Sequence, residues 1–524
     1  MKKTIIILVI TALFSSCSEK ILDVENENGY SAETFFSDAK SITEASTATY
    51  AVMNHGGLMA REWYFIYDLF GNDGEKNFPL QGALLSFPSF THSPDSRELN
   101  FLFTACYKML FRANYAIEAV EKWDTTDLVD IALGDRIIGE MEFLKSFANF
   151  VLVTSYGDVP LKKTFADHLI TEAPRTPKAE IWAYIETTLL DAINKLPVSY
   201  SANDYGRATK GAAVALLGKA YLFQGKYNDA ITQFEALGAS PYDYDLTGSL
   251  DDLFTGKDMK TKETIFAAMH GHWLGSGVGD PRYIFRRQES AAAGLVTHSA
   301  RDMEYGFRDF WNVLVSNALA NSFTYIDEGG NSYVDPRAAL TFYDNLGTSG
   351  GDQVFAEESA SGPILYSSIV GTASKILSWR KYEEYEEIVK LGQPQSWINT
   401  QIIRYADVLL MLAECHIQTN QVPEALPLIN RVRARSGAFE YTTLGSQAQA
   451  FEILKHERQM ELAGEQARWN DLVRWGIAVE TINDEKEAYN GTRPVKDYHV
   501  LFPIPRQERD SNPVLDAQVS NDWN

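Results

Sequence analysis

Cysteine, positive charge and long apolar runs are all scarce in this chain of 524 residues. With only 3 Cys, the chain cannot build the dense disulfide framework that stabilises small secreted domains. Asp and Glu number 70 against 47 Lys and Arg, which gives a formal net charge of −23. Because nucleic acids and anionic lipid head groups are both bound through clustered cationic side chains, this balance argues against either as a partner.

The signatures of common metal and nucleotide sites are missing as well. No His-Glu-x-x-His or Walker A segment occurs in the sequence. His270 and His272 form a His-x-His pair, but a catalytic zinc ordinarily needs three protein ligands. Four carboxylates lack the spacing of a calcium-binding EF-hand loop and are interpreted as solvated charges, namely Asp243, Asp245, Asp251 and Asp252. We therefore predict no metal and no cofactor.

The N-terminus carries the most specific motif in the chain. Two lysines precede an apolar stretch, residues 5–14, which is too short to span a membrane as a mature helix. The stretch ends in small residues and Cys17, which resembles the lipobox of bacterial lipoproteins, where the thiol is lipidated and the chain is cut just before it. We predict a lipoprotein signal peptide over 1–16 and a lipidated tether over 17–36, with lipid as the only attachment to the membrane. An ordinary signal peptide is the alternative.

Helical periodicity dominates both ends of the mature chain. Apolar residues recur at helical spacing in 38–54, 97–122, 135–155, 178–195, 207–224, 227–238, 402–419, 422–436, 448–464 and 467–476. Between about 240 and 400 this pattern weakens, and Gly, Ser, Asp and aromatic residues accumulate, as is typical of loops. Cys106 and Cys415 fall in helical segments and are interpreted as buried free thiols, with a disulfide between them left open. The pattern predicts a mainly α fold with a long loop-rich insertion.

Two of the helix pairs match the tetratricopeptide repeat, a helical hairpin of about 34 residues. In the first pair, Gly218 and Ala230 are the small residues that let two helices approach closely. Tyr221 and Phe234 are placed to fill the groove between those helices. The second pair, within 402–436, has the same offsets with a looser fit. The scaffold is therefore predicted to contain tetratricopeptide-like pairs separated by the insertion.

Clustered carboxylates near the C-terminal end raise the question of catalysis. Glu457, Glu461 and Glu465 are spaced to share a helix face, and glycosidases use paired carboxylates about 5–9.5 Å apart. Three arginines, Arg458, Arg468 and Arg474, are interleaved with acidic residues at helical spacing. The same interpretation applies to Arg431, Arg433 and Arg435. Ion pairs between packed helices account for this pattern, so the sequence favours a structural role and no enzymatic activity.

Several motifs along the whole mature chain resemble those of the SusD/RagB family. They are Phe-Leu-Lys-Ser-Phe (143–147) with Tyr-Gly-Asp-Val-Pro-Leu (156–161), Arg-Tyr-Ala-Asp-Val-Leu-Leu-Met-Leu-Ala-Glu (404–414), Ile-Asn-Arg-Val-Arg-Ala-Arg-Ser-Gly (429–437), Glu-Arg-Gln-Met-Glu-Leu (457–462), Arg-Trp-Asn-Asp-Leu-Val-Arg-Trp-Gly (468–476), Phe-Pro-Ile-Pro (502–505) and Asn-Pro-Val-Leu (512–515). The chain departs from the family at its closing residues, 518–523, and at Phe103, where many members carry Trp.

This resemblance implies one SusD-like helical domain over 37–524, with its scaffold in 37–240 and 400–480 and a ligand-face insertion at about 240–400. It also implies a lipid-anchored protein on the surface of the outer membrane, with a TonB-dependent SusC-like transporter as partner. Members of the family typically hand oligosaccharides to that transporter, and some handle peptides. We therefore predict glycan capture. A peptide-capturing protein, a surface glycosidase or peptidase, and an adhesive lipoprotein are the alternatives.

Sugar rings have apolar faces that stack on flat aromatic side chains, while polar side chains at the rim bond their hydroxyl groups. Two regions outside the predicted helices, 63–90 and 273–311, offer this mixture. The resemblance places the ligand face at comparable points of the chain. Candidate ligand-binding residues are Trp63, Asn72, Asp73, Phe78, Trp273, Tyr283, Arg286 and Trp311. Burial in the core is the alternative for each of the aromatic residues.

Overall fold

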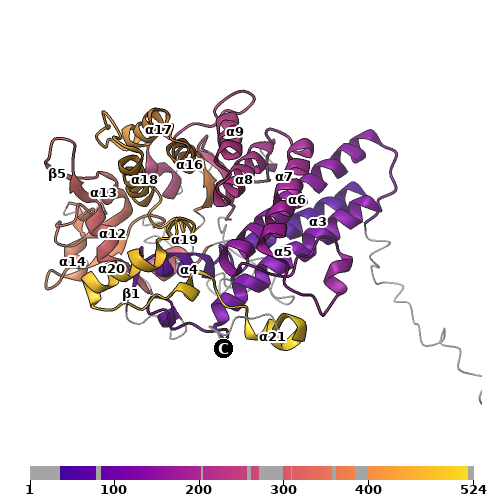
Figure 1. Ribbon diagram of the computed structural model, residues 1–524, viewed down its shortest axis with the longest axis horizontal. Helices are drawn as coiled ribbons and strands as arrows, with labels where there is room; N and C mark the ends of the chain where they lie inside the picture. Colours follow the sequence, from indigo (N-terminus) through magenta and orange to yellow (C-terminus); the bar gives the residue numbers. More distant parts are fainter. Residues whose placement is uncertain are drawn as a thin grey trace, which may run out of the picture.

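A computed structural model describes residues 36–77, 84–201, 204–255, 261–270, 299–308, 310–356, 362–383, 396 and 398–516. Helices predominate in these ranges, which confirms the predicted mainly α fold (Figure 1). Within the described part of the chain, no helix combines the length and the apolar character needed to cross a membrane. The predicted signal peptide and all but the last residue of the predicted tether lie outside these ranges.

The N-terminal half is a series of helices that pack against one another. They are α3 (Ala39–Tyr50), α5 (Arg97–Glu121), α6 (Leu128–Tyr156) and α7 (Lys178–Lys195), with 3-10 turns at Ala51–Asn54, Leu84–Ser86 and Ala166–Leu169. Helix α3 begins at a capping box, in which the Asp38 carboxylate accepts from Ser41 N over 2.8 Å. The long helices α5, α6 and α7 lie side by side in Figure 1, and each packs against the next.

Helices α8 (Lys210–Phe223) and α9 (Tyr227–Leu237) form the first predicted tetratricopeptide-like pair. Ala230 and Phe234 are buried between them. A Cβ atom built on Gly218 would lie 2.5 Å from the Phe234 ring, so only glycine allows this close approach. The prediction that small residues bring these two helices together is confirmed.

The second predicted pair, α16 (Tyr405–Gln418) and α17 (Val422–Arg435), stacks on the first through α9 and α16. Helix α18 (Gln447–Glu461) then packs on α16. The two pairs are therefore neighbours in space, although the whole insertion separates them in the sequence. Cys106 on α5 and Cys415 on α16 are buried free thiols, as predicted, and burial raises the pKa of each.

The described part of the insertion is built from short paired elements rather than from loops alone. Its strands form two-stranded antiparallel sheets, one of them with a strand from the N-terminal half: β3 (Val313–Val315) pairs with β1 (Gly74–Lys76) of that half. The other sheets are β2 (Thr264–Ala268) with β10 (Thr400–Arg404), β4 (Thr324–Ile326) with β5 (Ser332–Val334), β6 (Phe342–Asp344) with β9 (Leu377–Trp379), and β7 (Val354–Ala356) with β8 (Ile364–Leu365). Its helices are α10 (Leu250–Phe254), α11 (Arg301–Tyr305), α12 (Asn317–Ser322), α13 (Arg337–Thr341) and α14 (Tyr366–Val370). Elements this short show no measurable periodicity, which is why the sequence pattern did not reveal them.

One helix runs through a segment that the sequence pattern placed outside the helices. Helix α4 (Glu62–Phe70) is buried at every position except Trp63, so it has no exposed polar face. Trp63 therefore lies on a helix and not in a loop. The remaining C-terminal elements are α19 (Arg468–Arg474), which packs on α4, α20 (Ala478–Asn490), a 3-10 turn at Asp497–Val500, α21 (Arg506–Ser511) and α22 (Pro513–Asp516).

A buried network of ion pairs joins the insertion to α18. Arg337 Nη1 donates to Glu457 Oε1 over 2.6 Å, and Arg404 Nη1 donates to Glu461 Oε1 over 2.6 Å. Arg404 Nε donates to Glu465 Oε2 over 2.7 Å. Burial alone would raise the pKa of Glu461, but the surrounding guanidinium groups hold that pKa below its usual value. The predicted structural role of these glutamates is confirmed.

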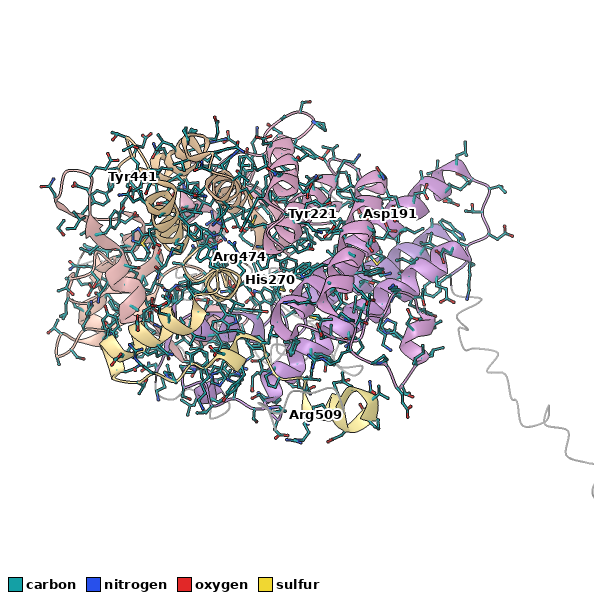
Figure 2. All side chains as sticks on the ribbon, viewed as in Figure 1. Asp191, Tyr221, His270, Tyr441, Arg474 and Arg509 are labelled. Atoms are coloured by element: carbon teal, nitrogen blue, oxygen red, sulfur yellow. The ribbon has the colours of Figure 1, made fainter. Side chains whose placement is uncertain are left out.

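The partners of these glutamates differ from the interleaved arginines expected from the sequence. Arg458 pairs with Asp407 and Asp471, and Arg474, which is labelled near the centre of Figure 2, pairs with Glu414 and Asp471. Two of the guanidinium groups that reach Glu457 and Glu461 belong to the further arginines named from the sequence, Arg433 and Arg435 on α17, and this part of the interpretation is confirmed. The other two, Arg337 and Arg404, come from α13 and β10. Helical spacing alone could not identify partners that lie so far away in the chain.

Candidate functional site

The two segments predicted to form a ligand face, 63–90 and 273–311, meet in the structure. Strand β1 of the first segment pairs antiparallel with β3, which directly follows the second segment. Next to this pairing, Asn77 N donates to Asn312 O over 2.9 Å. The described parts of both segments therefore contribute to one surface.

Trp311 lies at this junction in a strained backbone conformation. Its φ of +50° is in the left-handed region, which is costly for a bulky side chain. Two hydrogen bonds hold the residue there: Asn77 Nδ2 donates to Trp311 O over 2.9 Å, and Trp311 Nε1 donates to Ser378 Oγ over 2.8 Å. Strain of this kind persists only where the surrounding contacts impose it, so the orientation of the indole ring is fixed in advance.

Trp311 is half-buried beside an apolar cluster. Its half-buried ring packs against a small aromatic core made of Phe307, Tyr343, Phe355 and Tyr366. The neighbouring Phe310 is 40% exposed, and Arg308 is exposed with its guanidinium 5.3 Å from the Phe355 ring. An aromatic platform beside an arginine and an asparagine can stack on an apolar ring face and donate hydrogen bonds to its substituents.

Buried charges attach this surface to the core beneath it. Arg61, at the start of α4, donates through Nε to Glu304 over 2.7 Å and through Nη1 to Glu62 over 2.8 Å. Arg301 on α11 lies 3.3 Å from Asp68 on α4. Burial raises the pKa of Glu62 to about 7 although Arg61 is close by. These contacts fix α4 against α11, which lies just before Trp311 in the sequence.

Asn72 and Asp73 lie beneath the surface and support the turn between α4 and β1. Asn72 has a φ of +58° and donates through Nδ2 to Glu485 over 2.8 Å. Asp73 is buried, and its carboxylate accepts from Gly464 N over 3.4 Å and lies 3.8 Å from Arg468. Burial raises the pKa of Asp73 to about 7. Both side chains hold protein partners in this structure, and a ligand contact by either stays a prediction.

Trp63 is not brought next to Trp311. It packs on Tyr67, with ring centroids 4.6 Å apart, and on Phe147 at 6.4 Å. It lines a separate small cavity together with charged side chains that include Arg404, Asp407 and Glu465. These neighbours belong to the buried ion pairs, so the structure places Trp63 among scaffold contacts. Its predicted role in ligand binding stays a prediction.

The other predicted site residues lie outside the described part of the chain. They are the lipidation residue Cys17 and the candidate ligand contacts Phe78, Trp273, Tyr283 and Arg286. Two of the segments that contain them, 78–83 and 271–298, adjoin the described junction in the sequence. Their roles stay predictions.

The residues considered for catalysis or metal binding have structural contacts. His270 is buried near the centre of Figure 2, and its Nε2 lies 2.9 Å from Thr400 Oγ1. Asp243, Asp245 and Asp251 each pair with a different cation, namely Lys262, Arg431 and Arg380. Across the described residues, no group of three or more His, Cys, Asp or Glu side chains is arranged to hold a metal ion.

Three residues of this site were not singled out from the sequence. Phe310 directly precedes Trp311, so the pair of aromatic residues was a usable signal. Arg308 is an isolated exposed cation without a distinguishing pattern. Ser378 lies 67 residues beyond Trp311 in the chain, and no local pattern connects the two.

Comparisons with known proteins agree with one another. A family model described as SusD family matches residues 283–522, and one described as starch-binding associating with outer membrane matches residues 20–222. SusD-like protein P25 of Formosa agariphila is 25% identical, and the alignment covers 98% of each chain. A SusD superfamily protein from Bacteroides vulgatus has a TM-score of 0.73 at 24% identity, covering 92% of this chain and 99% of that one. A solved structure described as a laminarin binding SusD-like protein has a TM-score of 0.71 at 24% identity, covering 91% of this chain and 98% of that one.

Proposed function

The chain belongs to the SusD-like family, and we propose that it is a cell-surface lipoprotein that binds a neutral oligosaccharide and delivers it to a SusC-like TonB-dependent transporter. The binding face is the junction around Trp311. Support for a carbohydrate ligand comes from the starch-binding description of the matched family model and from the laminarin-binding neighbour of the same fold. The description of the same model, which names association with the outer membrane, supports the location.

The observation that carries this proposal is the geometry of Trp311. The backbone of Trp311 is strained, and its half-buried indole ring is held by the bond from Nε1 to Ser378, so the ring keeps one orientation. Little conformational entropy is therefore lost when a sugar ring stacks on it. Phe310, the residue before Trp311, adds an exposed aromatic side chain, and the predicted contact Phe78 follows Asn77 in the sequence. This is the combination of a rigid aromatic anchor and polar neighbours that neutral sugars require.

The same chain is proposed to bind and not to hydrolyse its ligand. Glycosidases need two carboxyl groups free to exchange protons on either side of the scissile bond. The three clustered glutamates on and just after α18 are instead buried and hydrogen-bonded to arginine. Their geometry suits a structural ion-pair network.

Lipid attachment at Cys17 is the part of the proposal that can be tested separately. A Cys17→Ala variant should lose metabolic acyl labelling and leave the membrane fraction, because no other segment of the sequence is long and apolar enough to hold it there. A variant that still sediments with membranes in the absence of detergent contradicts the anchor.

Binding at the junction is tested by calorimetry with laminarin-derived oligosaccharides. Trp311→Ala should weaken binding about tenfold, which corresponds to roughly 1.4 kcal/mol. Trp123→Ala is the matched control. Trp123 is also half-buried, but it follows the C-terminal end of α5 and packs against the main hydrophobic core, away from the junction. Unchanged affinity of a folded Trp311→Ala protein would reject this site. Binding of peptides in place of every glycan tested would reject the ligand class.

A further inference from the structure

A second cavity lies on the helical scaffold, between the α7–α8 connection, the segment after α9, and β2. Its volume is about 460 Å³, and a neighbouring cavity of about 310 Å³ shares Tyr205, Gly206 and Arg207 with it. We propose that this pair of cavities is a second binding site for a neutral oligosaccharide. The inference rests on the proposed glycan-binding function and extends it to a surface that the sequence pattern did not indicate.

Five tyrosines are among the residues that line this site. Tyr200, Tyr205, Tyr242 and Tyr244 line the larger cavity, and Tyr50 lines the smaller one; all five are half-buried. The rings of Tyr242 and Tyr244 are stacked, with centroids 6.0 Å apart and an interplanar angle of 15°. Several flat apolar faces with hydroxyl groups at their edges suit a chain of sugar rings better than they suit a purely apolar ligand.

Three of the five tyrosine hydroxyl groups are tied to the scaffold, so these three rings are held in place before any ligand arrives. Tyr200 OH donates to Ala208 O over 3.0 Å, and Tyr50 OH accepts from Ala208 N over 2.9 Å. Tyr244 OH lies 3.3 Å from Thr209 Oγ1, at the N-cap of α8. A preorganised set of rings loses little entropy when it binds, which favours even a shallow stacking site.

The charges around the cavities cancel locally. Arg207 donates through Nη1 to Glu140 over 2.8 Å and through Nε to Asp204 over 2.9 Å. At the exposed rim, Lys262 lies 2.7 Å from Asp243. Because each of these cations has a carboxylate partner, the lining offers no excess charge to an ionic ligand. A neutral carbohydrate fits this balance better than an acidic one.

The tyrosine site and the junction around Trp311 lie in different parts of the molecule. Figure 1 shows α3 and α8, which border the tyrosine site, to the right of β1, which pairs with β3 beside Trp311. Two weak sites on one protein can hold one long glycan more tightly than either site alone, provided that the glycan spans both. The second site would therefore retain a long glycan on the protein surface.

Hydroxyl-radical footprinting read by mass spectrometry tests both sites at once on the intact protein. The probes are laminarin-derived and starch-derived oligosaccharides at millimolar concentration, with a mixture of neutral peptides as the comparison. The inference predicts that an oligosaccharide lowers the oxidation of Tyr205 and Tyr242, while Tyr489, an exposed tyrosine on α20, keeps its rate. Unchanged oxidation of Tyr205 and Tyr242 with every oligosaccharide overturns the inference, and so does protection by the peptides alone.

The same measurement separates this inference from the proposed function. Protection of Trp311 without protection of Tyr242 rejects the second site and keeps the first, and the reverse pattern rejects the first and keeps the second. Tyr242→Ala should then abolish the protection of Tyr205 and weaken binding at this site about tenfold, without altering the protection of Trp311. Tyr489→Ala is the matched control and should change neither pattern.

Discussion

The helical scaffold and the insertion combine apolar packing and charged contacts in different proportions. In the scaffold, Gly218 and Ala230 let α8 and α9 touch, and Phe234 fills the space between them. In the insertion, Arg337 and Lys381 are almost fully buried, and each binds carboxylates at or near the end of α18. Apolar packing between helices that are adjacent in the sequence is therefore prominent in the scaffold, beside buried ion pairs of its own such as Arg458 with Asp407, whereas the insertion is attached to α18 by charged contacts with distant residues.

This difference follows from the size of the elements. Each sheet in the described part of the insertion has only two strands, and an isolated two-stranded sheet is marginally stable in water. Such elements keep their shape because buried ion pairs and aromatic clusters attach them to the scaffold. A binding face built on them can vary in shape while the scaffold remains the same.

The largest effect is expected where the insertion meets α18. Arg337→Met keeps much of the side-chain volume but leaves Asp335 and Glu457 without this partner, and breaking a buried ion pair from one side typically costs about 3–5 kcal/mol. Urea unfolding monitored by circular dichroism should show a loss of this size. Arg493→Met is the control, because Arg493 pairs with Asp484 and Glu487 on an exposed surface, and no measurable change is expected. Equal stability of the Arg337→Met and wild-type proteins would show that the network does not hold the insertion.

A smaller effect is expected within the scaffold. Ala230→Leu adds volume where α9 meets α8, and overpacking of this kind costs about 1–3 kcal/mol. Ala236→Leu on the same helix is the matched control, because Ala236 is exposed. Thermal unfolding should distinguish the two variants. If both variants have the melting temperature of the wild-type protein, then the close packing of α8 and α9 contributes nothing to stability.

The smallest stability effect concerns the turn beneath the binding face. Burial raises the pKa of Asp73 to about 7, above the value of about 3.9 for an unfolded chain, so the folded state binds an extra proton between these values. The folded state therefore loses stability as the pH rises through this window. Asp73→Asn removes that loss and should stabilise the protein at pH 8 by on the order of 1 kcal/mol, with little effect at pH 4. Asp135→Asn, at an exposed position, should show no such pH-dependent difference from the wild-type protein. If the stability of Asp73→Asn relative to the wild-type protein is the same at pH 4 and pH 8, the account is contradicted.

The scaffold could be predicted from the sequence because its contacts are local. Helix α7 occupies Lys178–Lys195, as the apolar spacing predicts, and the small residues of the α8–α9 pair revealed how it packs. Helix α4 escaped detection because it is buried on nearly all sides. The stacking of α9 on α16 could not be derived from repeat spacing, since the insertion lies between them.

The candidate site could be predicted only in part. Trp311 was identified as an aromatic residue outside the regular helices, and the meeting of its segment with 63–90 agrees with a shared face. Its left-handed backbone and its bond to Ser378 could not be foreseen, because both depend on the fold around β9. The tyrosine cavities were also missed, since their lining comes from α3, the α7–α8 connection and β2, which no sequence motif links.

The most direct test of the central claim is a crystal structure of the protein with a laminarin-derived oligosaccharide. The account predicts a sugar ring stacked on the Trp311 indole, with hydrogen bonds to Asn77 or Arg308 and with the Trp311 Nε1 bond to Ser378 kept. A bound oligosaccharide that leaves Trp311 uncovered would contradict the claim that this junction is the ligand face.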